Sequence, residues 1–207
     1  MRRRTMTNLL LALSAGAGLS MMTALNAPAA VAKVGAAAPA FTLTDLAGKE
    51  HTLASLKGKT VVLEWFCSGC PWSGKESRKS VHSTGQVKTL VADIKKADPN
   101  AVYLMIDSTA NMSKSNVIAT DTKLKAEYGI TGPILVDYDG KVGKAYGAKT
   151  TPHMFVIDKD GVLQYSGAFS DHGNRNYVLD AVKAVKEGKT PQPATTKAWG
   201  CGVKYKR

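Results

Sequence analysis

Two cysteines separated by two residues form the part of this sequence best suited to chemistry. Cys67 and Cys70 follow an almost continuously apolar run of strand length and precede a polar stretch in which apolar residues recur at helical spacing. We therefore expect the pair where a buried strand turns into a helix, with one thiol at the helix N-terminus. The helix dipole and nearby Lys75 and Arg78 would stabilise a thiolate there. At least one thiol should then have a pKa well below its reference value of ~8.5.

Two other roles for such a pair are a static disulfide and half of a zinc site. The residues that follow position 32 are numerous enough to bury a core without a covalent staple. Zinc would require further ligands, and Cys201 with four scattered histidines makes no recognisable second half of a site. Pro71, in place of a histidine after Cys70, excludes a covalent haem. Redox chemistry without metal or cofactor is favoured.

Apolar runs of strand length alternate with segments of helical periodicity after residue 40. This order predicts one α/β domain, with a central mixed sheet and helices on both faces. Strands are expected at 41–45, 60–66, 101–107, 134–137, 154–158 and 162–165, with a hairpin turn at 159–161. Helices are expected around 87–94, before Gly129, and at about 176–186. The domain spans 33–190, and a polar tail at 191–207 carries Cys201.

The first 32 residues have the order of features found in export signals. Arg2, Arg3 and Arg4 form a basic start, residues 9 to 25 a weakly apolar stretch, and Ala30-Val31-Ala32 a small-x-small cleavage site. An uncleaved membrane anchor is the alternative, but the stretch is short and no charged stop follows it. We expect a periplasmic or secreted protein that does not span the membrane after cleavage.

The charge balance is basic, with 28 Lys and Arg against 16 Asp and Glu. The basic residues are scattered, and no arginine-rich run or interleaved aromatic pattern appears. Nucleic acid is therefore not expected as a partner.

Several motifs make the chain similar to a known family. They are 38–43 (Ala-Pro-Ala-Phe-Thr-Leu), 58–65 (Gly-Lys-Thr-Val-Val-Leu-Glu-Trp), Cys70-Pro71, and 151–158 (Thr-Pro-His-Met-Phe-Val-Ile-Asp). The chain resembles thioredoxin-like redoxin-domain proteins of the AhpC/TSA and TlpA-like kind, over nearly its whole length after residue 32. Residues 144–150, 176–178 and the tail Gly200-Cys201-Gly202-Val203-Lys204-Tyr205 match a narrower exported subgroup.

The resemblance implies a thioredoxin-like fold and roles for further residues. It implies that Thr151-Pro152 is the cis-proline turn that faces the active-site thiols, where an extended substrate segment can pair with the backbone. Members of the subgroup match Cys70 and Cys201 but carry Asn at the position of Cys67. That departure creates the Cys67/Cys70 pair and leaves two partners competing for Cys70.

Two further side chains near the motifs could take part. Glu64 stands in an otherwise apolar strand, so burial would raise its pKa and make it a proton relay for the thiols. A surface or ion-paired glutamate on a sheet edge is the alternative. His153 is a metal ligand or an acid in one interpretation and a packed, hydrogen-bonded histidine in the favoured one.

Three functions of different classes fit these residues. The first is a thiol–disulfide oxidoreductase that acts on disulfide-containing proteins or small molecules and exchanges electrons with a thiol donor. The second is a peroxiredoxin-like peroxidase in which Cys70 attacks peroxide and Cys67 or Cys201 resolves it. Peroxiredoxins carry Thr or Ser at the position of Cys67, which weighs against this. The third is a copper carrier using the thiolates and His153. The first is favoured.

The roles of the three cysteines are not equivalent in this interpretation. The thioredoxin pattern makes Cys67 the attacking thiol, whereas the Cys-Pro match favours Cys70, so both assignments stay open. We expect Cys67–Cys70 to be the working redox pair because the two are close in sequence. Cys201, flanked by Trp199, Gly200 and Gly202, is expected on a docked tail as an auxiliary or resolving partner of Cys70.

The leader generates the first testable prediction. Cleavage after Ala32 should give a mature protein that begins at Lys33. Intact-mass measurement of protein isolated from its native compartment checks this, and a mass that includes residues 1–32 contradicts it.

Overall fold

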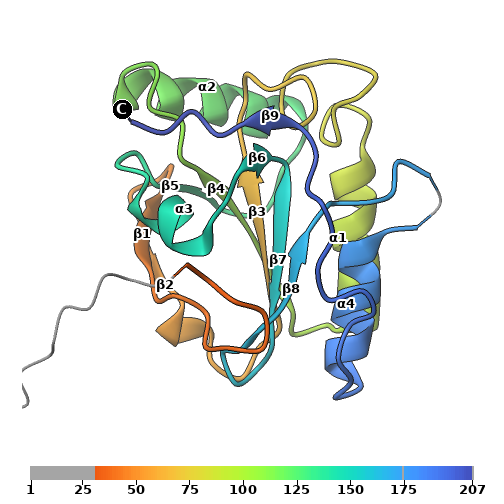
Figure 1. Cartoon of the computed structure of the whole chain (residues 1–207). Helices are drawn as coiled ribbons and strands as arrows, with labels where there is room; N and C mark the ends of the chain where they lie inside the picture. The colour runs from red at the N-terminus through yellow and green to blue at the C-terminus, as the bar shows by residue number, and fades with distance from the viewer. Residues whose placement is uncertain (1–30, 174, 207) are drawn as a thin grey trace, which may run out of the picture.

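The computed structural model describes residues 31–173 and 175–206, so the predicted leader lies almost wholly outside the described residues. A seven-stranded sheet forms the centre of the domain, in the order β2-β1-β5-β4-β3-β7-β8 (Figure 1). The strands are β1 (Thr42–Asp45), β2 (Glu50–Thr52), β3 (Val61–Phe66), β4 (Val102–Asp107), β5 (Ile134–Val136), β7 (His153–Ile157) and β8 (Leu163–Gly167). The helices are α1 (Gln86–Ala97), α2 (Lys114–Glu127), α3 (Lys141–Tyr146) and α4 (Tyr177–Lys186), and a single 3-10 turn spans Ala54–Leu56.

The sheet is mixed, as the sequence predicts. β3 pairs in parallel with β4 and β4 in parallel with β5, whereas β7 runs antiparallel to both β3 and β8. All six residues of β3 are buried, which explains its almost continuous apolar run at the middle of the sheet. Phe66 lies opposite Asp107, and Trp65 lies opposite His153. The ends of β3 and β4 and the beginning of β7 therefore meet at one edge.

Each face of the sheet is covered by its own apolar layer. On one face, alternate β3 residues such as Val62 and Phe66 pack against apolar residues of α1 and α4, including Leu90 and Val182. On the other face, Trp65 and its neighbours pack against α3 and the N-terminal segment. Successive side chains of β3 thus belong alternately to the two layers. This confirms the predicted arrangement of helices on both faces.

The polar tail is folded onto the domain and forms part of a second sheet. β9 (Cys201–Gly202) pairs antiparallel with β6 (Thr150–Thr151), directly before Pro152. The peptide bond between Thr151 and Pro152 is cis, as the family resemblance implies. Figure 1 shows the tail running from α4 along β8 and over the ends of the central strands.

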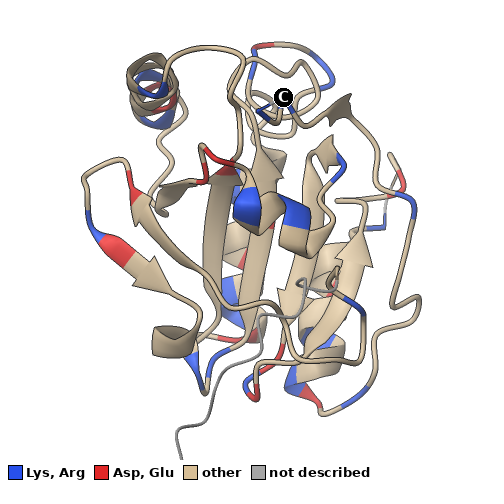
Figure 2. Ribbon diagram, turned by 60° about the vertical axis from the view of Figure 1, so that its left-hand side comes forward, with Lys and Arg blue, Asp and Glu red and all other residues tan. Residues whose placement is uncertain are grey.

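Charged side chains are spread over the molecule. Figure 2 shows Lys and Arg on several helices and loops, interspersed with Asp and Glu. In the described residues, no helix has both the length and the apolar character needed to cross a membrane.

Candidate functional site

The two cysteines of the motif lie in an irregular loop, and the predicted helix directly after them is wrong. α1 begins only at Gln86. Between Pro71 and Gly85, serine side chains bond to the backbone that a helix would use: Ser83 Oγ donates to Ser77 O at 2.8 Å, and Ser77 Oγ donates to Pro71 O. Serine favours such local bonds over helical ones. In the described residues, no helix therefore begins at either thiol, contrary to the prediction.

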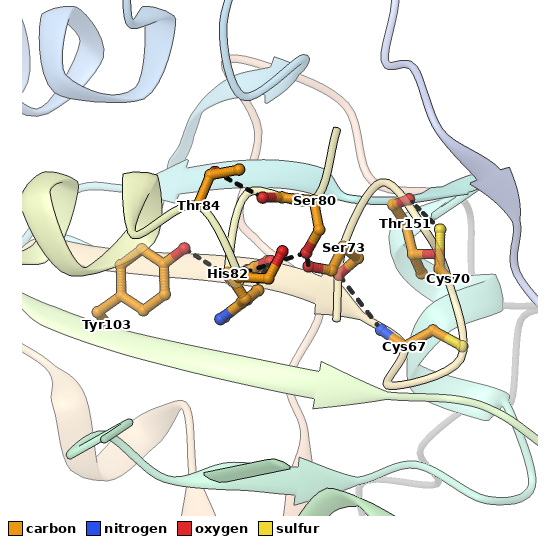
Figure 3. Close-up of polar contacts among 10 residues, drawn as sticks. Cys67, Cys70, Ser73, Ser80, His82, Thr84, Tyr103 and Thr151 are labelled. Carbon is orange, nitrogen blue, oxygen red and sulfur yellow. Dashed lines mark hydrogen bonds and ion pairs between the residues drawn. The ribbon is translucent and has the colours of Figure 1, made fainter. Parts of the chain in front are cut away.

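Cys70 is the buried thiol of the pair, with 2 % of its surface exposed. Its Sγ donates to the carbonyl oxygen of Thr151 at 3.1 Å, beside the cis proline (Figure 3). Burial raises the pKa of Cys70, but the neighbouring Cys201 thiol, Thr151 hydroxyl and Trp72 N–H, all of which can donate to a thiolate, outweigh it. The pKa of Cys70 is thereby lowered. The predicted direction holds for this cysteine, with hydrogen bonding as the cause in place of a helix dipole.

Cys67 has the opposite character. Its Sγ accepts a hydrogen bond from Thr109 Oγ1 at 3.4 Å, and its N–H donates to Ser73 Oγ at 3.5 Å. Burial, together with the negative charge of Asp107, raises the pKa of Cys67 to about 11. Lys75 and Arg78 are exposed on the loop. At neutral pH Cys67 is a thiol and a poor nucleophile.

The docked tail brings the third cysteine to the other two. Cys201 is the register partner of Thr151, whose carbonyl accepts from Cys70, and its thiol lies near enough to Cys70 to lower the pKa of that thiol. Burial and the neighbouring Cys70 raise the pKa of Cys201 to about 11. Gly200 permits this approach: its φ is +129°, and a Cβ there would overlap the carbonyl oxygen of Thr151.

Glu64 is fully buried in β3 at the centre of the sheet, so a surface or sheet-edge position is wrong, whereas the ion-paired part of that alternative fits its contact with His82. Its carboxylate is held by His82 Nε2 at 2.9 Å and by Tyr103, whose hydroxyl donates at 2.7 Å (Figure 3). A carboxylate bound in this way is occupied by partners other than the thiols. Glu64 is connected to the thiol loop only indirectly. The backbone N–H of His82 donates to Ser73 O at 3.2 Å, and Ser73 in turn accepts from the Cys67 N–H. Sequence reasoning missed His82 and Tyr103, which lie 18 and 39 positions from Glu64.

His153 takes the packed and hydrogen-bonded role. Its Nδ1 accepts from the Lys149 N–H at 3.2 Å, its Nε2 lies 3.4 Å from Ser166 Oγ, and its ring lies 4.5 Å from that of Phe155. Burial lowers the pKa of His153 to about 4. Across residues 31–173 and 175–206, no group of three or more His, Cys, Asp or Glu side chains is placed to hold a metal ion.

Two buried aspartates that the sequence reasoning did not select lie behind Cys67. Asp107 ends β4, and its Oδ1 accepts from the Thr109 N–H at 2.6 Å. Asp121 comes from α2 and is fully buried. Burial raises the pKa of Asp107 to about 6, and burial together with the charge of Asp107 raises that of Asp121 to about 8. The only sequence signal of its burial was the helical spacing of Asp121 from Val117 and Leu124, the apolar residues that α2 also buries.

The chain is similar to known proteins over most of its length. The family model described as Redoxin matches residues 33–182. The chain belongs to the redoxin family. It is 27 % identical over 186 residues to thiol–disulfide oxidoreductase ResA of Bacillus subtilis, covering 89 % of this chain and 93 % of the relative. The ResA of Geobacillus kaustophilus is 28 % identical over 158 residues, covering 76 % of this chain and 82 % of the relative.

Solved structures agree on the fold. An uncharacterized conserved protein from Geobacillus kaustophilus superposes with a TM-score of 0.71 at 24 % identity, covering 84 % of this chain and 93 % of that one. A thiol:disulfide interchange protein DsbE from Chlorobium tepidum gives a TM-score of 0.51 at 20 % identity, covering 65 % of this chain and 84 % of that one. The sequence prediction of a thioredoxin-like thiol–disulfide oxidoreductase is confirmed.

The buried acid pair makes stability depend on pH. Because the pKa of Asp121 is about 8 when folded and near 3.8 otherwise, the folded protein holds a proton that the unfolded chain lacks between these values. The stabilisation is complete below about pH 4 and is lost as pH rises to about 8. We expect Asp121→Asn to raise the free energy of unfolding by roughly 1–3 kcal/mol near pH 8 and by little at pH 4.

Urea unfolding of both proteins across this range measures the effect. His153 changes stability in the opposite sense, but it is present in both proteins and cancels in the difference. Asp93→Asn on α1, a partly exposed position whose carboxylate pairs with Lys96, is the control. A difference between the Asp121→Asn and wild-type proteins that does not vary with pH contradicts the prediction.

The approach of Gly200 to β6 gives another prediction. Gly200→Ala should displace β9, because strain of roughly 1–3 kcal/mol at a positive φ is enough to weaken a two-residue strand. In a background with Cys67→Ser and Cys201→Ser, the alkylation rate of Cys70 should rise by about tenfold or more. Gly202→Ala is the matched control, since a Cβ there meets nothing within 4 Å. Equal rates in the two alanine variants would show that the tail does not cover Cys70.

Proposed function

We propose that this chain is an exported thiol–disulfide oxidoreductase in which Cys70 is the attacking thiol. The observation that carries the proposal is the contrast among three neighbouring sulfurs: the pKa of Cys70 is lowered, whereas those of Cys67 and Cys201 are raised to about 11. Only Cys70 is therefore primed as a thiolate. Its contact with Thr151 O places it beside the cis-proline turn, where substrate would pair with the backbone.

The reaction then proceeds in two exchange steps. The Cys70 thiolate attacks one sulfur of a substrate disulfide, that bond breaks, and the first substrate thiolate leaves. Cys67 loses its proton and attacks Cys70, so a Cys67–Cys70 disulfide forms and the second substrate thiolate leaves. A thiol electron donor returns the pair to the dithiol state by the same steps. Disulfide-containing proteins or small molecules are the proposed substrates.

Cys201 is proposed as an auxiliary partner of Cys70. The Cys201 thiol lowers the pKa of Cys70, and its strand pairs with the backbone of β6. A Cys70–Cys201 disulfide would hold the tail in place over the site. With substrate bound, the tail would have to leave β6, and Cys67 would then be the resolving partner within reach.

Export is proposed from the leader and from the relatives. The curated relatives carry the name thiol–disulfide oxidoreductase ResA, and one structural relative is titled a thiol:disulfide interchange protein DsbE. The basic start, the apolar stretch and the Ala-x-Ala site supply the signal in this chain. Disulfide exchange suits a compartment in which disulfides persist.

Insulin reduction in the presence of a small thiol tests the function. Cys70→Ser should reduce the rate to the background of the small thiol alone. Cys67→Ser should slow turnover and allow a mixed disulfide on Cys70 to accumulate, which mass spectrometry detects. Cys201→Ser should keep most of the activity. Non-reducing peptide mapping of the oxidised protein shows which cysteines pair.

A peroxide assay run in parallel completes the test. Rapid Cys70-dependent peroxide consumption without insulin reduction would contradict the proposal and favour the peroxidase. An oxidised protein in which Cys67 remains a free thiol would contradict the Cys67–Cys70 pair.

A further inference from the structure

Two buried carboxyl groups behind Cys67 have no role in the exchange steps described above. Asp107 is 1 % exposed and Asp121 is fully buried. Within the described residues, both carboxyl oxygens of Asp121 and Oδ2 of Asp107 lack a hydrogen-bond partner. Two neighbouring carboxylates that are both buried and both charged would be strongly destabilising. The pair therefore titrates as a unit that keeps one proton around neutral pH.

Thr109 joins this acid pair to the thiol. Its hydroxyl donates to Cys67 Sγ at 3.4 Å, and its N–H donates to Asp107 Oδ1 at 2.6 Å. The residue whose backbone binds the acid thus also carries a rotatable O–H against the sulfur. Asp121 completes the unit, since the charge of Asp107 raises its pKa.

The resolving step needs such a proton acceptor. Cys67 must become a thiolate to attack Cys70, and a second negative charge beside the anionic acid pair would be repelled. If the proton moves onto the pair, the site holds one negative charge before the transfer and one after it. The cost of placing an additional charge in a buried site is then avoided.

We infer that the Asp107–Asp121 pair takes the proton of Cys67 through the Thr109 hydroxyl when Cys67 resolves the mixed disulfide on Cys70. The S–H bond of Cys67 breaks and its proton moves to the pair, which becomes uncharged. The Cys67–Cys70 bond forms, the bond between Cys70 and the substrate breaks, and the electron pair leaves on the substrate sulfur. The reverse reaction returns the proton. The inference rests on the proposed function.

The other titratable groups around the pair have partners of their own. Asp137, which follows β5, also raises the pKa of Asp107, but its own carboxylate accepts from Ser108 Oγ at 2.6 Å and from Gly143 N at 2.8 Å. Glu64 is bound by His82 and Tyr103. Cys70 and Cys201 interact electrostatically with Cys67. Among the buried acids of the described residues, only the pair thus has carboxyl oxygens without a hydrogen-bond partner.

The two steps can be separated by stopped-flow reaction with dithiobis-nitrobenzoate, a disulfide that releases a coloured thiolate. In a Cys201→Ser background, the first release reports attack by Cys70 and the second reports resolution by Cys67. With the acid pair intact, the second rate should rise with pH to about 6 and stay level to about 8, because the pair keeps one proton over this range and proton transfer within the site does not change the proton count. Without the pair, Cys67 must lose its proton to solvent.

The Asp107→Asn/Asp121→Asn variant should therefore show a second rate that rises about tenfold per pH unit from 6 to 9, with no plateau. The first rate should keep its pH profile. Thr109→Val should lose the plateau in the same way, and Thr109→Ser should restore it, which guards against a folding defect in the double variant. Asp98→Asn is the matched control. Asp98 is also a buried acid, but it accepts from Thr60 just before β3, at the opposite end of that strand from the thiols.

The outcomes separate the two proposals. A second release whose pH profile is the same in wild type and in the double variant would overturn the role of the acid pair while leaving Cys67 as the resolving thiol. Absence of any second release with the acid pair intact would overturn both the Cys67–Cys70 pair and this inference.

Discussion

The site depends on the register of β3 between β4 and β7. Because β3 and β4 are parallel, their carboxyl ends reach the same edge of the sheet, and β7 starts at that edge because it is antiparallel. The loop with Cys67, the acid at the end of β4 and the cis-proline turn before β7 therefore meet without any of them being neighbours in sequence. A slip of one residue in β3 would also turn its fully buried side chains to the wrong layers.

Long apolar runs made the central strands predictable, and β7 and β8 were predictable from the turn at 159–161, where Gly161 has a φ of +84°. The loop from Pro71 to Gly85 was not predictable, because its four serines form local hydrogen bonds that no periodicity reveals. β6 and β9 have two residues each and exist only because distant segments pair. Their lengths are below what an alternation pattern can detect.

The same limit applies to the site. The cysteines and the cis-proline turn were found from spacing and resemblance, since each is a short local motif. Glu64 was selected because a charge in an apolar strand is conspicuous, but its partners His82 and Tyr103 come from other elements. Asp121 looked like an ordinary helical surface residue. Its burial depends on how α2 lies against the end of β4, which no local pattern encodes.

The tail does more than carry Cys201, because it also covers the outer edge of β8. Ser166 N–H donates to Ala194 O, the Thr196 N–H donates to Ser166 O, and Thr196 Oγ1 accepts from the Ala168 N–H at 2.8 Å. β8 is the last strand of the sheet, and its unpaired backbone would otherwise be a template for another chain. A protein that lost its tail would therefore expose the unpaired edge of β8 as well as the Cys70 thiol. One segment thus covers both an open strand edge and the Cys70 thiol.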